Sequence, residues 1–168
     1  QYSHAKKDYL KDELWQDNFR HLTNRKLSFD IQIYPHQFDD ACKLAKRYPN
    51  VQFVLNHTGE PCFQTEEYKK YWMRKMQSLA EHENFICKIS GLGMFNPSWT
   101  IISTEFFILN TIEIFGIDRC MFGSNFPVDK IFNTFDNYWS SYFDIVKNFS
   151  QNEHDKIFLR NAEKFYRI

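Results

Sequence analysis

The sequence has no excess of charge of either sign and no long hydrophobic run. Its 168 residues carry 21 Lys and Arg against 21 Asp and Glu, so the formal net charge is zero. Nucleic-acid-binding surfaces usually show a clustered basic excess, which is missing here. No apolar run approaches the roughly 18 residues of a membrane-spanning helix, and the polar start, residues 1–12, does not resemble a secretion signal. We therefore expect neither nucleic acid nor a membrane as a partner.

The four cysteines, Cys42, Cys62, Cys87 and Cys120, include no CxxC pair. Unpaired thiols of this kind are typical of a reducing compartment, so we expect a cytoplasmic protein without disulfides. Cys62 and His57 could share a metal ion, but two ligands do not define a metal site.

Periodicity predicts strands that alternate with helices. Period-two or apolar runs predict strands at 28–34, 51–55, 85–90 and 119–123. Helical spacing predicts helices over 8–24, 38–47, 64–83, 100–115, 132–148 and 150–166. Gly116 supplies a stop for the fourth helix, and Ser150 with Glu153 forms a capping box for the last. This order predicts βαβ units and a parallel sheet.

Polar side chains on one face of the strands favour a barrel over an open sheet. Asp30, Gln32 and Tyr34 share one face of the first strand, and Lys88 interrupts the third. A sheet covered by helices on both sides would be apolar on both faces, whereas a barrel lumen that leads to a site tolerates polar groups. A (β/α)8 barrel has eight strands in about 250 residues. We therefore expect residues 1–168 to form one partial domain, the C-terminal half of a TIM barrel, with open sheet edges and an uncovered lumen face.

Chemistry in such barrels lies at the C-terminal ends of the strands. Here the strands run into YPHQ, NHTGEP, SGLGM and GSNFPVD, which contain turn-forming Gly and Pro beside polar side chains. The segments VLNHTGEP, KISGLGMF and RCMFGSNFPVD resemble, in order and spacing, the motifs of strands six, seven and eight in the amidohydrolase-related family. The resemblance is greatest to its sugar-lactone and dicarboxylate-lactone hydrolases, and it extends over residues 25–168 to the ending NAEKFYRI.

The resemblance implies roles for two residues. His57 matches the strand-six histidine of the family, a metal ligand or active-site base, and a neutral imidazole serves either role near pH 7. The alternative is a histidine that caps a buried strand end. Asn125 stands where the family usually has the Asp of strand eight, and an amide is no general base and a poor metal ligand. Asn125 is either an orienting group in the site or a turn residue.

Five further residues are candidates for substrate binding. His36 follows the first strand, where it is a site histidine or a surface turn residue, and Tyr34 directly precedes it. Lys88 either binds an anionic substrate group or pairs with Asp30, and Ser90 either lines the site or packs. Asp129 lies outside the matched position, and we expect it near the rim, just outside the cluster, because Pro127 turns the chain.

Three functional hypotheses follow. The first is hydrolysis of a sugar or carboxylic-acid lactone by water attack, with a divalent metal such as zinc held in part by His57, or without metal. The second is metal-dependent amide hydrolysis or decarboxylation on the same scaffold. The third is a degenerate or truncated barrel without catalysis, favoured for this chain alone by Asn125 and by the absent strands one to four. The family's HxH pair is among the missing parts, and His4, near the start, does not form one. We expect a small-molecule substrate, an inactive isolated chain, and self-association into a homo-oligomer.

Overall fold

The protein alternates parallel strands with helices over residues 8–168, which are the residues that the computed structural model describes. His4 and the first residues of the expected domain lie outside them. The strands are β1 (Ser28–Ile31), β2 (Gln52–Leu55), β3 (Phe85–Ile89) and β4 (Cys120–Phe122). The helices are α1 (Glu13–Asp17), α2 (Phe19–Arg25), α3 (Phe38–Arg47), α4 (Glu66–Ala80), α5 (Leu92–Phe95), α6 (Ile101–Phe115), α7 (Phe135–Ile145), α8 (Gln151–Asp155) and α9 (Asn161–Tyr166).

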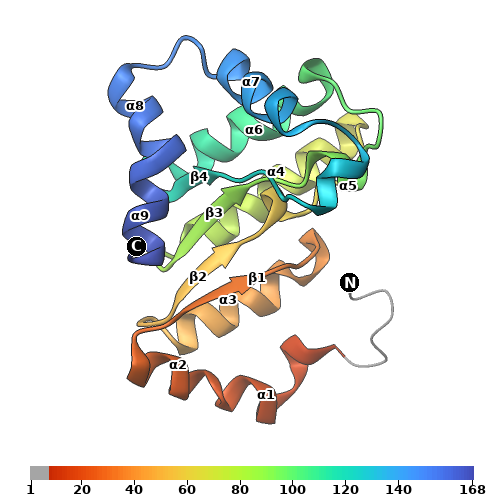
Figure 1. Ribbon diagram of the computed structural model, residues 1–168. Helices are drawn as coiled ribbons and strands as arrows, with labels where there is room; N and C mark the ends of the chain where they lie inside the picture. Colours follow the sequence, from red (N-terminus) through yellow and green to blue (C-terminus); the bar gives the residue numbers. More distant parts are fainter. Residues whose placement is uncertain (1–7) are drawn as a thin grey trace.

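The four strands form one parallel sheet in the order β1-β2-β3-β4, which confirms the predicted arrangement (Figure 1). In register, Ile31 lies opposite Leu55, Leu55 opposite Cys87, and Cys87 opposite Cys120. The first strand ends at Ile31 rather than at the predicted position 34, because β2, its neighbour in the sheet, ends at Leu55 and turns. The alternation of burial nevertheless continues past the strand, since Ile33 is buried while Gln32 and Tyr34 are partly exposed.

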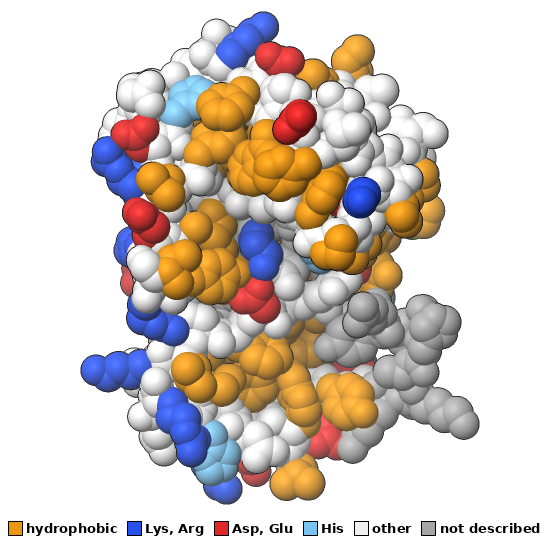
Figure 2. All heavy atoms as spheres, in the orientation of Figure 1, with side chains coloured by type: hydrophobic (Ala, Val, Ile, Leu, Met, Phe, Trp, Pro, Cys, Tyr) orange, Lys and Arg blue, Asp and Glu red, His pale blue; other side chains and the backbone are white. Residues whose placement is uncertain are grey.

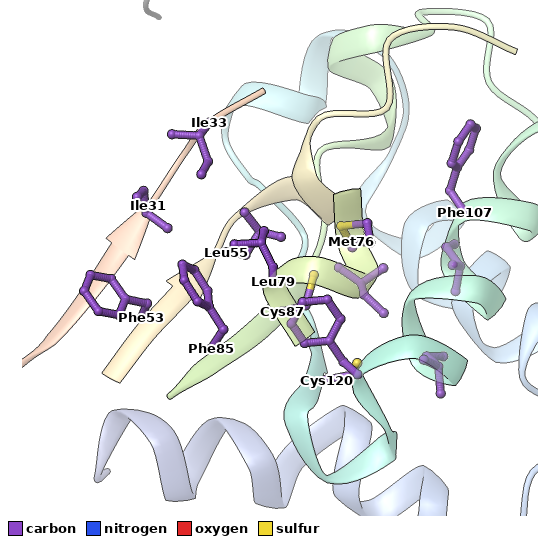
Figure 3. Close-up of a cluster of buried hydrophobic side chains, with 14 of the residues drawn as sticks. Ile31, Ile33, Phe53, Leu55, Met76, Leu79, Phe85, Cys87, Phe107 and Cys120 are labelled. Carbon is purple, nitrogen blue, oxygen red and sulfur yellow. The ribbon is translucent and has the colours of Figure 1, made fainter. Parts of the chain in front are cut away.

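One face of the sheet packs against helices α3, α4 and α6, which lie behind the strands in Figure 1. Apolar side chains that alternate along the strands meet the buried faces of these helices, as Figure 3 shows. Its labelled residues are Ile31, Ile33, Phe53, Leu55, Met76, Leu79, Phe85, Cys87, Phe107 and Cys120. The helix side of the sheet is therefore the main core, and it fixes the positions of the strand ends.

The opposite face, which would line a barrel, is only partly open. Val54, Ile86 and Met121 form a small second cluster on this face with Phe165 of α9, and Ala162 and Tyr166 pack against it. The expectation of an uncovered lumen face is therefore wrong for this part of the sheet, because the C-terminal helix supplies apolar cover. Figure 2 shows hydrophobic side chains still exposed elsewhere on the side of the molecule seen in Figure 1.

The helices follow the predicted pattern except at the beginning. The single helix predicted over 8–24 is a 3-10 turn followed by α1 and α2, because Asp12 is extended (φ −86°, ψ 112°) and its side chain caps α1 at Trp15. The last helix begins at the predicted capping box of Ser150 and Glu153 and includes a π-helical turn, 156–160, between α8 and α9. Gly116 ends α6 as expected.

Within residues 8–168, no helix combines the length and the apolar character that crossing a membrane requires.

Candidate functional site

The chain makes an unusual turn where β2 ends. Four consecutive residues, His57, Thr58, Gly59 and Glu60, have positive φ angles of 54°, 56°, 65° and 55°. Residues with a Cβ rarely adopt this left-handed region, which costs roughly 1–2 kcal/mol each. Three such residues within four positions mark a segment whose conformation is imposed by its surroundings, as happens at many functional sites.

Contacts from α3 and α4 hold this turn in place. The Trp72 indole Nε1 donates to the carbonyl oxygen of Thr58 at 3.1 Å, and the Tyr68 hydroxyl donates to that of Glu60 at 3.4 Å. Gly59 packs so closely that an added Cβ would lie 2.7 Å from Phe38 and 3.0 Å from Met76. The strained turn is thus anchored to the core, and it presents two side chains, those of His57 and Glu60, at the carboxyl end of the sheet.

His57 is fixed by the end of the neighbouring strand. Its Nδ1 lies 2.9 Å from the Ser90 hydroxyl oxygen, which follows β3 directly, and only 8% of the residue is exposed. Its ring lies against the backbone of Gly91, where an added Cβ would come within 2.7 Å of Nδ1. Gly91 itself has a φ of +68°, so the position favours glycine for two reasons. Ser90 and Gly91 therefore determine the orientation of the imidazole.

The His57 imidazole is neutral at pH 7. Burial lowers its pKa from 6.5 to about 4, and the charge of Lys88 lowers it further than Asp30 raises it. Desolvation disfavours the charged form of a buried imidazole. A neutral imidazole carries a proton on one nitrogen and a lone pair on the other, which can accept a proton or bind a metal, and the Ser90 contact is at Nδ1.

Asn125, which follows β4, contacts the segment that follows β3 and Ser90. Asn125 has a φ of +55°, so it is a turn residue, and its side-chain amide lies 3.0 Å from the Met94 sulfur. Met94 belongs to α5, the short helix that begins after Gly91, and its backbone N–H donates to the Gly91 carbonyl oxygen. His57, Ser90 and Asn125 are thus brought to neighbouring strand ends, with the β3 end between the other two.

Asp129 does not lie at the rim, and that expectation is wrong. The residue is completely buried, and the Asn125 amide donates to its Oδ1 at 2.8 Å. Burial raises its pKa, while the neighbouring Asn125 and Tyr138 side chains lower it in part. Pro127 turns the chain as predicted, but the short 3-10 helix at 128–131 carries Asp129 back inward instead of outward.

Lys88 forms an ion pair with Asp30, which was one of the two roles predicted for it; the other was to bind an anionic group of the substrate. Its Nζ lies 2.6 Å from the Asp30 carboxylate and 3.1 Å from the Tyr166 hydroxyl, which itself donates to Asp30 at 3.0 Å. The three residues come from β3, β1 and α9 and form one polar group on the lumen face. The positive charge of Lys88 is therefore compensated within the protein.

His36 follows the end of β1, the strand next to β2 in the sheet. It is exposed after β1 and stacks on the Tyr34 ring, with centroids 5.9 Å apart and planes 10° from parallel. Within the described part of the chain, His36 forms no hydrogen bond or ring contact with His57, Ser90 or Asn125. Of the four residues expected to converge, His57 and Ser90 are in direct contact, and Asn125 contacts Met94 in the segment that follows Ser90.

Glu60 is a residue of the site that the sequence reasoning missed. It is 1% exposed, and neither carboxylate oxygen has a hydrogen bond of ordinary geometry within residues 8–168. Burial raises its pKa, and the nearby Gln32 and Tyr34 side chains lower it in part. Tyr34 in turn has a pKa raised by burial and then by Glu60 and Cys62. The only sequence signal was an acidic residue after a strand end, which usually marks an exposed turn.

A small cavity lies beside His57 on the helix side of the strand ends. It has a volume of about 20 Å³, and His57, Thr58, Ser90, Asn96, Thr104 and Phe107 are among its lining residues. A cavity of this size has room for about one water molecule. It is too small for a lactone ring.

The described residues do not fit a complete metal site. Among them, no group of three or more His, Cys, Asp or Glu side chains is placed to hold a metal ion, and Cys62 directs its thiol to the Glu60 carbonyl oxygen. The Asn125 amide, at the family's carboxylate position, donates to Asp129. His57 is one available ligand, and the others would have to come from outside residues 8–168.

The sequence is similar to curated bacterial proteins. The chain is 42% identical over 154 residues to the uncharacterized protein y4mH of Sinorhizobium fredii, and this match covers 92% of this chain and 52% of that protein. It is 26% identical over 169 residues to an L-fucono-1,5-lactonase of Burkholderia ambifaria, and this match covers 98% of this chain and 58% of that enzyme. The chain thus spans about half the length of the curated relatives it matches.

The fold matches solved barrels as well. An amidohydrolase from Burkholderia multivorans with bound zinc superimposes with a TM-score of 0.89 at 21% identity, over 95% of this chain and 59% of that one. The sequence matches the amidohydrolase family over residues 2–168. This chain belongs to the amidohydrolase family.

Proposed function

We propose that the protein hydrolyses a lactone ring and that these 168 residues contribute the C-terminal half of its (β/α)8 barrel. The observation that carries the proposal is His57, a buried imidazole at the carboxyl end of β2 that is neutral at pH 7 and oriented by Ser90. The similarity to an L-fucono-1,5-lactonase supports a lactone as the substrate class. Polar groups on the lumen face and the open strand ends support the barrel.

In this proposal His57 accepts a proton from the attacking water. With Nδ1–H donating to the Ser90 hydroxyl oxygen, the lone pair of Nε2 is the basic site. As the water oxygen attacks the ring carbonyl carbon, the proton passes to Nε2, and the ring C–O bond of the resulting intermediate then breaks. The same imidazolium can return the proton to the departing ring oxygen, which leaves a hydroxy acid.

Ser90, Asn125 and Asp129 have supporting tasks. Ser90 holds the tautomer and the ring plane of His57, as the partner of a catalytic histidine does elsewhere. The Asn125 amide is polarised by its bond to the buried Asp129 and lies beside the β3 end, where it orients substrate or water. Tyr34, Lys88 and His36 line the approach on the lumen side, and the remaining strands of the barrel close it.

Zinc bound to a structural neighbour supports a divalent metal as a component of the complete site. If His57 were a ligand of that metal, its Nε2 lone pair would be occupied, so a ligand role is the alternative to its role as the base. A bound divalent metal would supply Lewis-acid polarisation of the carbonyl. Because residues 8–168 do not form a metal site by themselves, the roles of His57, Ser90 and Asn125 are derived without it.

The test is a substrate panel on the full-length protein. Sugar lactones, dicarboxylate lactones, N-acyl amino acids and aromatic carboxylates would be compared by proton release and by carbon dioxide release. We expect turnover of at least one lactone and none of the amides or the aromatic acids. Amide hydrolysis or decarboxylation without lactone turnover would favour the second hypothesis, and no turnover of any class would favour a degenerate barrel.

A further inference from the structure

A chain of buried hydrogen bonds leads to the Asp129 carboxylate from the loop before α6 and from α7. The Trp99 indole Nε1 donates to the Tyr138 hydroxyl oxygen at 3.1 Å, and both side chains are buried. An indole N–H can only donate, so the Tyr138 oxygen accepts from Trp99 and its own proton is left for another acceptor. That acceptor is Asp129, with which the Tyr138 side chain also forms a hydrogen bond. The direction of the chain is therefore fixed, from Trp99 through Tyr138 to Asp129.

Asp129 accepts hydrogen bonds and donates none. Burial raises the pKa of this carboxyl group, and the donors around it, the Asn125 amide, the Tyr138 hydroxyl and the Gly93 N–H, lower it in part. Donors of this kind favour the charged form of a carboxyl group. A carboxylate cannot donate, so the group of Asn125 that lies 2.8 Å from Asp129 Oδ1 is its NH2 and not its carbonyl oxygen.

The Asn125 amide is held by its nitrogen, which leaves its oxygen available. Its Nδ2 lies 2.8 Å from Asp129 Oδ1 and 3.0 Å from the Met94 sulfur, so both hydrogens of the NH2 group have a partner inside the protein. Its Oδ1 forms no hydrogen bond within residues 8–168, and it is not among their enclosed polar atoms that lack a partner. Asn125 is half-buried, and the atom that it presents outside the loop is therefore an acceptor.

We propose that Asp129 and Tyr138 are positioning residues that keep the Asn125 carbonyl oxygen directed at the site, where it accepts a hydrogen bond from the attacking water. This inference rests on the proposed function, in which one hydrogen of the water passes to Nε2 of His57. The second hydrogen stays on the water oxygen, and Asn125 Oδ1 accepts a hydrogen bond from it. An amide cannot take the proton, but with both hydrogens of the water engaged, a lone pair of its oxygen is aimed at the ring carbonyl carbon.

The orientation of the amide is tested by NMR on the full-length protein. The Asn125 side-chain NH2 signals are identified by their absence from the spectrum of Asn125→Ala. Because both hydrogens are bonded inside the loop, they should exchange with water at least tenfold more slowly in wild type than in Asp129→Leu, which has a similar size and no acceptor. The NH2 group of Asn110, which donates to the Phe106 carbonyl oxygen on α6, is the internal control and should exchange at the same rate in both proteins.

The effect on catalysis is tested by a double-variant cycle with the best lactone of the panel. Asn125→Ala and Asp129→Leu should each lower kcat about tenfold or more with little change in KM. In the Asn125→Ala background, Asp129→Leu should lower kcat by no more than about twofold, because the group that it positions is gone. Tyr138→Phe, which removes only the hydroxyl group, should lower kcat in wild type but not in Asn125→Ala. Asp144→Leu, an exposed change on α7, is the matched control and should leave kcat unchanged.

Two results would overturn this inference and leave the proposed hydrolysis standing. One is fast exchange of the Asn125 NH2 group in wild type that Asp129→Leu does not change, which would mean that the amide is reversed. The other is a double variant whose loss of kcat is the product of the two single losses, which would mean that Asp129 acts on the fold and not through Asn125. If Asp129→Leu does not fold, Tyr138→Phe replaces it in both measurements. Full-length wild type that hydrolyses no lactone would overturn the proposed function and this inference together, before any variant is made.

Discussion

Acidification should destabilise the protein through His57. The folded state binds a proton at this imidazole only below about pH 4, whereas the unfolded chain binds one below its ordinary value of 6.5. Stability contributed by the neutral ring is therefore fully present above pH 6.5 and is lost as the pH falls from 6.5 to 4. At about 1.36 kcal/mol per pH unit, the loss on going from pH 7 to pH 4 amounts to about 3 kcal/mol.

The assay is urea unfolding of wild type and of His57→Gln between pH 7 and pH 4. Glu60 and Asp129, whose pKa values are raised, contribute with the opposite sign, but they are common to both proteins and cancel in the difference. We expect the wild type to lose about 3 kcal/mol more than the variant over this range. His21→Gln removes an exposed imidazole from α2 and serves as the control that should behave like wild type.

Parallel stability curves for wild type and His57→Gln would refute this reasoning, because they would mean that the imidazole is not desolvated in the folded protein. An NMR titration of the His57 ring gives an independent check. A midpoint near 6.5 would likewise contradict a buried, neutral base.

Three other predictions concern the strand ends and the sheet edges. Gly91→Ala should lower lactone turnover tenfold or more by displacing the His57 ring, whereas Gly116→Ala, with nothing within 4 Å of the added Cβ, should leave turnover unchanged in the same kinetic assay. Asn125→Asp should lower the free energy of unfolding at pH 7 by about 1–3 kcal/mol in urea, because it places two carboxylates together, and this loss should shrink as the pH falls. The double variant Asn125→Asp with Asp129→Asn, which exchanges the two side chains, should restore the stability. A double variant as unstable as Asn125→Asp would contradict the pairing. The isolated chain should self-associate in sedimentation experiments through the open edges of β1 and β4, and a monodisperse monomer would contradict this.

Much of the fold could be predicted because the helix side of the sheet follows simple periodicities. The alternation at Phe29, Ile31 and Ile33 and the apolar runs of β2 to β4 place the strands, and α3 and α6 have the predicted limits within one residue. The start of the chain was harder, since helical spacing over 8–24 does not reveal that Asp12 caps a new helix.

The cover on the lumen face could not be predicted from local patterns. Phe165 and Tyr166 belong to an ordinary amphipathic helix, and only the path of the chain brings them onto Val54, Ile86 and Met121, more than forty residues away in sequence. Their contacts are long-range, and a single sequence gives no signal for them.

The candidate site was predictable where a residue directly follows its strand. His57 and Ser90 meet because β2 and β3 are parallel neighbours, and Lys88 faces Asp30 because both lie on the same side of the sheet. Glu60 and Asp129 were missed or misplaced because acidic residues in turns are usually exposed. Their burial depends on the left-handed turn after His57 and on the inward 3-10 turn after Pro127, and neither backbone path has a reliable sequence signal.

The most direct test of the account is the rate of lactone hydrolysis by His57→Gln in the full-length protein, with the best substrate of the panel. Loss of a general acid–base group typically lowers a rate by about 10²-fold or more, and we expect a fall in kcat of that size with a small change in KM. A variant that folds like wild type and retains its kcat would contradict the assignment of His57 as the catalytic base.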